Sequence, residues 1–188
     1  MENFIEFAQS LFPSINPYTA ASVKQSIRQF LNGNSGNCLT SDLNASLVQG
    51  DIIFDLPFVV YGIDGAKYTS RFPAIVLSNS CDIENDDYIA VAPLQPISKF
   101  KINNDAIMKN TFFSLFYIPD NRINDYVINF GLINTFPKKP IEKALEEGKI
   151  KRNYSLNLFG YYFFLCKLTI HFMRPEDTEL QDLRAKTT

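Results

Sequence analysis

The chain has 188 residues, of which 46% are hydrophobic and 14% aromatic, and its 18 basic and 20 acidic side chains give a net charge of −2. This composition is typical of a globular domain with a hydrophobic core and excludes a disordered or fibrous protein. The net charge excludes an overall positive field that would attract nucleic acid to the whole molecule. With one histidine and three cysteines, a single chain cannot supply paired-histidine chemistry, an HExxH site or the usual structural zinc sites, so we expect no metal and no cofactor.

The start of the chain does not resemble a secretory signal. MENFIEFAQSLFP carries Glu2 and Glu6 and lacks both the basic region and the uninterrupted apolar region that a signal needs. The longest apolar run, 161–166, is far shorter than the roughly 20 residues that span a bilayer. The three cysteines are widely spaced, which is typical of free thiols in a reducing compartment. A cytoplasmic protein with no membrane contact is expected.

Two amphipathic helices are predicted before the main body of the chain. The first ends before Pro13, whose ring cannot continue a helix, and the second ends at Gly33. Their apolar stripes consist of Phe4, Phe7, Ala8 and Leu11, and of Val23, Ile27, Phe30 and Leu31. The stretch 32–44 is rich in Asn, Gly and Ser and is typical of a linker. We therefore assign 1–45 to an N-terminal helical segment and linker.

From Gly50 onward the sequence changes to short runs rich in β-branched and aromatic residues, which predict strands. These predicted strands are 51–58, 72–77, 88–94, 111–118 and 126–136. Between the first two, glycine and aspartate residues predict a loop that projects Tyr68 and Arg71. Five or so short, closely spaced strands favour a small, strongly bent sheet or barrel, and we assign 46–137 to it.

Helices are predicted over 138–175, followed by a frayed acidic tail at 176–188. The first of them follows Pro137 and ends at Gly148. The surrounding stretch 138–152 is also the most basic of the chain, so Lys138 and Lys139 are candidate contacts for nucleic acid.

The last predicted helix begins at Ser155 and has two distinct faces. Its apolar face is formed, at steps of three and four residues, by Phe159, Phe163, Cys166, Ile170 and Met173. Its polar face is formed by Lys167, His171 and Arg174. We therefore expect Cys166 in the core and the lone histidine at the surface between two cations.

The order of QGDIIFDLPF, a Gly-rich loop, RFPAIVLSNSCDI and YIAVAPLQPISKF resembles the first half of the MazF/PemK-like SH3-type barrel. Two later blocks, FYIPDNRINDYVINFGLINTFP and SLNLFGYYFFLCKLTIHFMR, resemble a group of largely uncharacterised bacterial proteins with an S-x-[ST]-C-D motif. The resemblance covers about 50–174. It implies an α+β protein with a mainly β core, in which an SH3-like β-barrel of five or six strands follows two helices and is closed by a C-terminal helix.

The resemblance also implies two functions, and both stay open here. MazF/PemK toxins are sequence-specific endoribonucleases, and their catalytic arginine matches Arg71, whose guanidinium suits the charge of a phosphorane. The family's threonine has no counterpart at the next strand end, where Ser98 and Gln95 are the substitutes. One hypothesis is thus a metal-independent endoribonuclease. The other, which we favour, is a non-catalytic or partner-dependent module of a bacterial toxin–antitoxin or phage-defence system.

The favoured module would bind a protein partner encoded nearby, or RNA or DNA, and a homodimer is compatible with both hypotheses. Its candidate binding residues are Tyr68, Asn79, Cys81, Asp82, Lys138 and Lys139.

The stretch SNSCDIENDD, residues 78–87, allows several interpretations. Cys81 with Asp82 and His171 would support acyl transfer or thiol redox chemistry, if the fold brought the three together. Metal ligation by Cys81 and nearby carboxylates is disfavoured because thiolate is a soft ligand. Asn79 and Asp82 could instead form a ligand site at a barrel rim. The interpretation we prefer is a turn in which the polar side chains bond backbone amides and Cys81 fills a tight apolar space.

Overall fold

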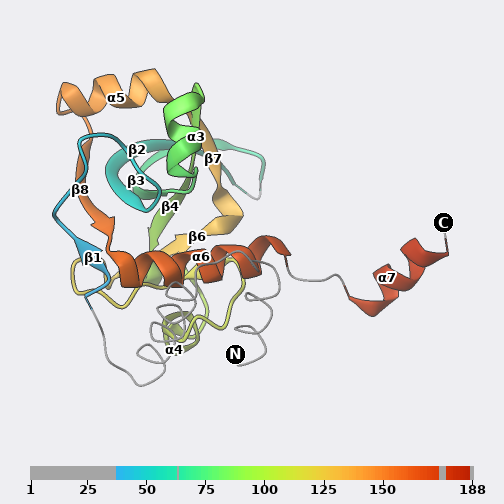
Figure 1. The fold of residues 1–188 in the computed structure, drawn as a ribbon. Coiled ribbons are helices and arrows are strands. Elements are labelled where there is room, and N and C mark those ends of the chain that lie inside the picture. The colour runs from blue at the N-terminus through green and yellow to red at the C-terminus, as the bar shows by residue number, and fades with distance from the viewer. Residues whose placement is uncertain (1–36, 63, 174–176, 187–188) are drawn as a thin grey trace.

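The computed structural model describes residues 37–62, 64–173 and 177–186, so the two predicted N-terminal helices lie outside the described residues. The described chain is a mixed α+β protein with a mostly β core built on an eight-stranded antiparallel sheet (Figure 1). The strands are β1 (Leu39–Thr40), β2 (Asp51–Tyr61), β3 (Lys67–Val76), β4 (Tyr88–Pro96), β5 (Leu115–Phe116), β6 (Tyr126–Asn129), β7 (Asn134–Pro137) and β8 (Lys151–Leu156). The helices are α3 (Ser80–Asn85), α4 (Asn104–Met108), α5 (Lys138–Glu146), α6 (Leu158–Met173) and α7 (Thr178–Ala185), with 3₁₀ turns η1 (Ile97–Lys99) and η2 (Phe130–Leu132).

The order of strands in the sheet is β1-β8-β2-β3-β4-β6-β5, and β7 also pairs with β4. The predicted strand 126–136 is therefore one strand interrupted by η2, since β6 and β7 pair with successive parts of β4. The interruption has a local cause, because the side chain of Asn129 accepts a hydrogen bond from the N–H of Gly131 at 2.9 Å. The predicted strand 111–118 is reduced to the two residues of β5.

Strands β2 and β3 form a long hairpin whose register runs from Ile52 opposite Ile75 to Tyr61 opposite Lys67. The prediction of a loop up to Arg71 was wrong, because β-branched and aromatic residues on both sides of the turn pair as strands. The other neighbours, β8 and β4, pair only with the base of the hairpin. Its distal half is therefore a two-stranded ribbon, which extends away from the rest of the sheet in Figure 1.

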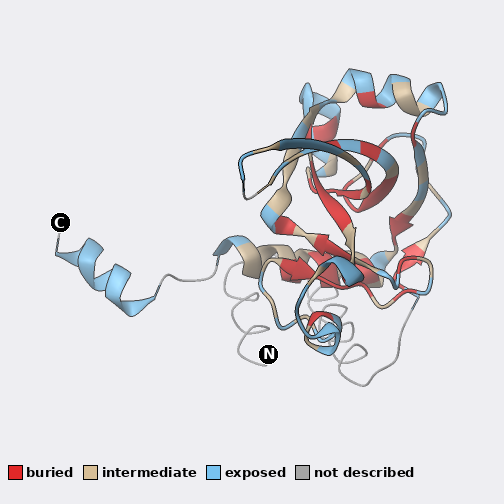
Figure 2. Cartoon of the chain, turned by 180° about the vertical axis from the view of Figure 1, so that it is seen from behind, coloured by how far each residue is buried: buried red, intermediate tan, exposed pale blue. Residues whose placement is uncertain are grey.

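The core lies between the sheet and its helices, as the buried residues in Figure 2 show. The largest cluster joins the sheet to α6, where the ring of Phe163 lies edge-on to Phe116 at 4.9 Å between centroids. A second cluster packs α5 against the hairpin base, and a third lies around η1 and α4. No helix within the described ranges is both long and apolar enough to cross a bilayer.

Helix α6 confirms the predicted C-terminal helix, although Ser155 and Leu156 belong to β8 and the helix begins at Leu158. Cys166 is buried as predicted, and burial raises the pKa of its thiol to about 12.

The placement of Lys167 on a polar face was wrong. Its side chain is buried, and its ammonium donates to the backbone carbonyls of Asn110 and Phe112 at 3.0 and 2.6 Å. Burial lowers the pKa of this amine to about 8. The carbonyl acceptors come from a loop more than 50 residues away in sequence, so helical periodicity could not reveal them.

Candidate binding surface on the hairpin

One face of the distal β2–β3 hairpin is exposed along its whole length. The register places Pro57 opposite Arg71, Val59 opposite Thr69 and Tyr61 opposite Lys67. All six side chains are exposed, and we call them the hairpin face. Its aromatic ring, Tyr61, is 68% exposed. Both of its charged residues are cations, so this surface combines a flat ring with positive charge.

The opposite side of the hairpin supports this face with buried rings. Phe58 lies edge-on to Phe72 and Phe136, at 6.0 and 5.6 Å between centroids. Near the tip, Tyr68 lies on the same inner side but remains 52% exposed. It was predicted on a loop and lies instead in β3, beside Gly62, where an added Cβ would come within 2.9 Å of the tyrosine ring. The close approach favours glycine at that position.

Arg71 has a structural contact that its sequence position did not indicate. Its Nη1 donates to the backbone carbonyl of Asp55 at 2.7 Å. Asp55 has a φ of 66° and lies where the register of the two strands shifts, so the guanidinium stabilises a β-bulge. This bond uses one of the five guanidinium donors, and the side chain stays exposed.

The two residues predicted to act with Arg71 are not joined to it by any hydrogen bond in the described chain. Ser98 lies exposed in η1, and Gln95 Oε1 accepts from Asn129 Nδ2 at 2.9 Å. Lys99 of η1 does contact β3, since its Nζ lies 4.8 Å from the centroid of the Phe72 ring, but Phe72 points to the opposite side of β3 from Arg71. The fold thus places η1 beside β3 without assembling a catalytic group.

Ser78, Asn79 and Ser80 of the SNSCDIENDD stretch accept hydrogen bonds from backbone amides, as the turn interpretation predicts. The Oδ1 of Asn79 accepts from the N–H of Cys81 at 3.0 Å and caps α3, a short helix where only a turn was expected. The hydroxyls of Ser78 and Ser80 accept from the N–H groups of Ala90 and Gln49. The prediction that Cys81 fills an apolar space was wrong, because its side chain is exposed.

The helical turn explains this difference. It directs Ile83 into the core in place of the cysteine, while Asp82 remains exposed.

The Cys81, Asp82 and His171 constellation is not assembled. Cys81 and Asp82 lie in the first turn of α3, whereas His171 is near the C-terminal end of α6 and its imidazole lies against the Phe130 ring, 5.4 Å between centroids. Among the residues that the structure describes, no group of three or more His, Cys, Asp or Glu side chains could hold a metal ion.

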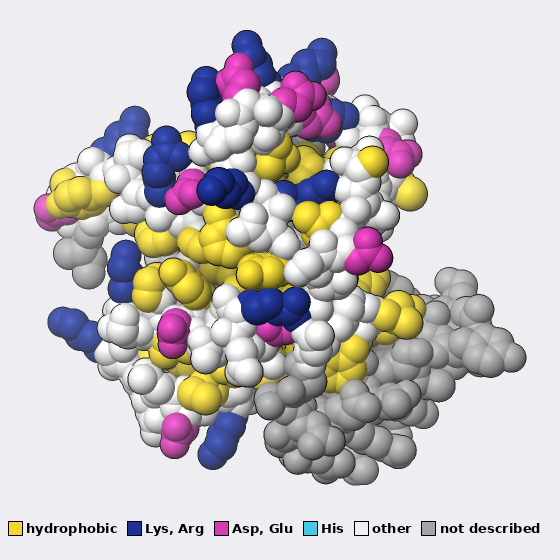
Figure 3. All heavy atoms as spheres, turned by 90° about the vertical axis from the view of Figure 1, so that its left-hand side faces the viewer, with side chains coloured by type: hydrophobic (Ala, Val, Ile, Leu, Met, Phe, Trp, Pro, Cys, Tyr) yellow, Lys and Arg dark blue, Asp and Glu magenta, His cyan; other side chains and the backbone are white. Residues whose placement is uncertain are grey.

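The basic stretch around α5 carries mixed charge. Lys138 donates from Nζ to the carbonyls of Ile83 and Glu84, at 2.7 and 3.2 Å, and so closes the C-terminal end of α3. Lys143 and Lys149 both pair with Glu147, and Figure 3 shows acidic and basic side chains intermixed over this helix. Lys139 is exposed. These contacts make the region a weaker candidate for nucleic acid than the hairpin face.

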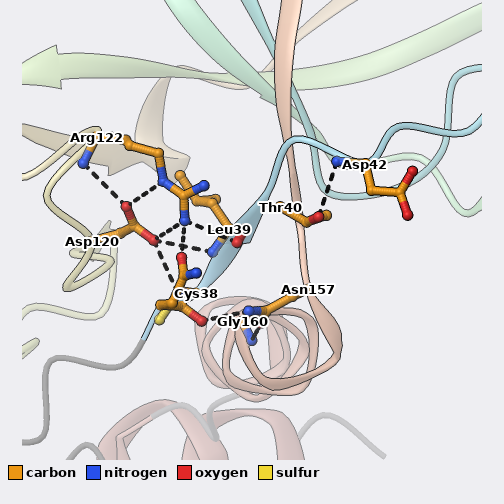
Figure 4. A network of polar contacts seen from close by, with 9 residues as sticks. Cys38, Leu39, Thr40, Asp42, Asp120, Arg122, Asn157 and Gly160 are labelled. Carbon is orange, nitrogen blue, oxygen red and sulfur yellow. Dashed lines mark hydrogen bonds and ion pairs between the residues drawn. The ribbon is translucent and has the colours of Figure 1, made fainter.

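Two ion pairs with buried carboxylates were not predicted from the sequence. Asp51 is completely buried and accepts from Arg152 Nη1 at 2.9 Å. Asp120 accepts from Arg122 and from the N–H groups of Cys38 and Leu39, as Figure 4 shows. Asp51 and its partner Arg152 are 101 residues apart. Arg122 is only two residues from Asp120, but the N–H groups that the same carboxylate binds are about 80 residues away.

No protein-family model matches the chain, and no curated protein matches it at a significant level. The candidate surface therefore has to be judged on its own geometry.

The three thiols should differ sharply in reactivity. In the folded protein we expect a small alkylating agent at pH 8 to modify Cys81, because it is exposed, while Cys38 and Cys166 stay unmodified because they are buried. Burial and, as a smaller effect, the nearby negative charge of Asp120 raise the pKa of the Cys38 thiol to about 12. Intact mass should show one adduct, and Cys81→Ser should show none. Two or more rapid adducts on the folded wild-type chain would contradict this burial pattern.

Proposed function

We propose that this protein is a non-catalytic binding module of the MazF/PemK-like type, in which the hairpin face binds single-stranded RNA. The observation that carries the proposal is the exposed row of Tyr61, Lys67 and Arg71 on a ribbon stiffened by buried rings. Bases stack on exposed aromatic rings, and cations contact the phosphates, so this combination suits a flexible polyanion. We place the module in the cytoplasm, in a bacterial toxin–antitoxin or phage-defence system.

The finer architecture proposed with this function is an SH3-like barrel. Its support is the succession of a bulged first strand, a long hairpin and a third strand that continues into a polar 3₁₀ turn. In this proposal the strands of the barrel are β2, β3, β4, β6 and β7.

Charge favours RNA over a protein partner at this face. Lys67 and Arg71 are the only charged members of the hairpin face, and both are cations. A protein partner encoded nearby would have to be acidic to complement these groups. Binding of such a partner, and not of RNA, is the other outcome of the experiment below.

A metal-independent ribonuclease is the alternative. The Arg71 side chain favours it, because it is exposed and its bond to the Asp55 carbonyl uses only one of the five guanidinium donors. Against it, Gln95 is engaged by Asn129, and part of the Arg71 guanidinium holds the bulge.

The test is to incubate the purified protein with a pool of end-labelled single-stranded RNA and to measure both retention and cleavage. We expect binding without cleavage, and we expect Tyr61→Ala to weaken binding about tenfold, the typical effect of losing one stacked base. Tyr88→Ala is the matched control, because Tyr88 is an exposed tyrosine, 59% against 68% for Tyr61, at the start of β4. Its affinity should equal that of the wild type.

Other results would decide between the hypotheses. Cleavage that is lost in Arg71→Ala would replace the binding module by the ribonuclease. Equal RNA affinity for Tyr61→Ala and Tyr88→Ala would remove the hairpin face as the binding site.

A further inference from the structure

Helix α6 is apolar on the side that faces away from the sheet as well as on the side that packs against it. Its inner side is marked by Gly160, Phe164 and Lys167, which are buried against the rest of the fold. On the opposite side, steps of four and three residues define what we call the outer face of α6. Its members are Leu158, Tyr162, Leu165, Thr169 and Phe172. None of them carries a charge, and a helix that is apolar all round is normally covered on all sides.

The outer face is only partly covered: Leu165 packs against the largest core cluster, and the two ends of the face are exposed. Leu158 is 64% exposed and Phe172 is 61% exposed. At its border, Cys166 is buried although it belongs to none of the three core clusters that the described residues form. The spacing of the face is that of a helix–helix seam, so the partner it fits is an amphipathic helix.

The start of the described chain is fixed at the first turn of α6. The carbonyl of Cys38 accepts from the N–H of Asn157 at 3.0 Å, and Asn157 Nδ2 donates to the carbonyl of Asn37. The contact is close enough that a Cβ on Gly160 would lie 2.2 Å from the Cys38 carbonyl oxygen. The 36 residues before Asn37 therefore leave the described fold beside this helix.

We propose that the outer face of α6 is the docking surface of the chain's own N-terminal segment, residues 1–36. The sequence of this segment predicts two amphipathic helices, whose stripes match the seam in spacing and in lack of charge. Leu31 is six residues from Asn37, so it lies within about 20 Å of the first turn of α6. The helix itself has 16 residues and is about 24 Å long. The tether also gives the segment an effective concentration in the millimolar range.

Two other occupants are less well matched. Helix α7 contains no buried residue, and its apolar side chains are limited to Leu180, Leu183 and one alanine. A second copy of the chain would have to compete with a tethered segment. Both are outcomes of the test.

The test is photo-cross-linking in the full-length chain. A benzoylphenylalanine in place of Tyr162 keeps an aromatic side chain on the outer face, and the same residue in place of Tyr88 serves as the control. After irradiation and digestion, mass spectrometry should find the residue at 162 linked to peptides from 1–36 of the same chain, and the control should not form this link. A link to 178–185, a link between two chains, or no link to 1–36 would overturn the proposal.

A second measurement uses Cys166 as a reporter in a Cys81→Ser background. Ile27→Glu puts a charge on the predicted docking stripe, and Gln25→Glu adds the same charge outside the stripe. We expect Ile27→Glu to speed alkylation of Cys166 at least about tenfold by opening the cover, and Gln25→Glu to leave the rate unchanged. Equal rates would count against the proposal. Cys38 must stay unmodified in both variants; if it reacts, the variant has unfolded and the cross-link alone decides.

Discussion

Replacing Arg152 by methionine is expected to lower the free energy of unfolding by about 3–5 kcal/mol, the usual effect of leaving a buried charge without its partner. Asp51 is completely buried, and its Oδ2 accepts from Arg152 Nη1 and from the N–H of Val48, both at 2.9 Å. Its Oδ1 has no hydrogen-bond partner among the described residues. The same guanidinium donates to the carbonyl of Ser46 at 2.7 Å, so the substitution also frees the segment that leads into β2.

Equilibrium unfolding in urea measures this effect. Lys151→Met is the matched control, because Lys151 is the exposed neighbour on the same strand, and it should change the free energy of unfolding by less than about 0.5 kcal/mol. Removing both charges with Asp51→Asn and Arg152→Met should be less harmful than the sum of the single changes, because no unpaired charge remains. A loss below about 1 kcal/mol for Arg152→Met would mean that the pair contributes only as surface pairs do.

Replacing Asp120 by asparagine is expected to lower the free energy of unfolding by about 3 kcal/mol at neutral pH. The carboxylate accepts from Arg122 Nε and Nη2, both at 2.8 Å, and from the N–H groups of Cys38 and Leu39 at 3.0 and 3.1 Å. The NH₂ group of an asparagine is itself a donor, and it would face the guanidinium and N–H donors that the carboxylate now accepts from. The loss would release β1 from the loop that carries Asp120.

The substitution at Asp120 should also change how the free energy of unfolding depends on pH. Burial alone would raise the pKa of Asp120, but hydrogen bonds and charge from Arg122 and the N–H of Leu39 outweigh it and lower the pKa from the ordinary 3.8. The unfolded chain therefore binds a proton first, so this stabilisation is present above the ordinary pKa and is lost as the pH falls below it. Unfolding followed from pH 6 to pH 2 should be less acid-dependent in Asp120→Asn than in the wild type. Asp42→Asn, at an exposed carboxylate, should follow the wild type; identical acid dependence in all three proteins would contradict the assignment.

Local patterns predicted those elements whose stabilising contacts are close in sequence. The bases of β2 and β3, strand β4 and helix α5 with its stop at Gly148 follow from β-branched runs and helix-end residues. Gly148 has a φ of 67°, as a helix stop of this kind requires. Strand β8 was missed because Ser155 falls in step with the apolar spacing of α6. The strand is stabilised by pairing with β1 and β2, which are about 100 residues earlier.

Arg71 is the one residue of the hairpin face that was a candidate from the sequence, and Tyr61 and Lys67 were not. Tyr68, Arg71 and Asn79 are exposed, which their residue types could suggest, but Tyr68 and Arg71 lie within β3 and not on a loop. Their roles depend on distant groups, because Arg71 bonds the carbonyl of Asp55 across the hairpin, and Lys138 bonds the carbonyls that end α3. Such backbone acceptors leave no mark in the sequence, since every residue carries one.

The position of β8 between β1 and β2 has a consequence for how the protein is made. On the ribosome, β1 and β2 emerge early, but the strand that separates them emerges only after about four fifths of the chain. Until then β2 has an open edge, Asp51 lacks its cation, and the site on α6 that fixes Cys38 has not been synthesised. Long-range pairing of this kind slows folding, so a nascent chain stalled before residue 151 should remain a substrate for chaperones and proteases.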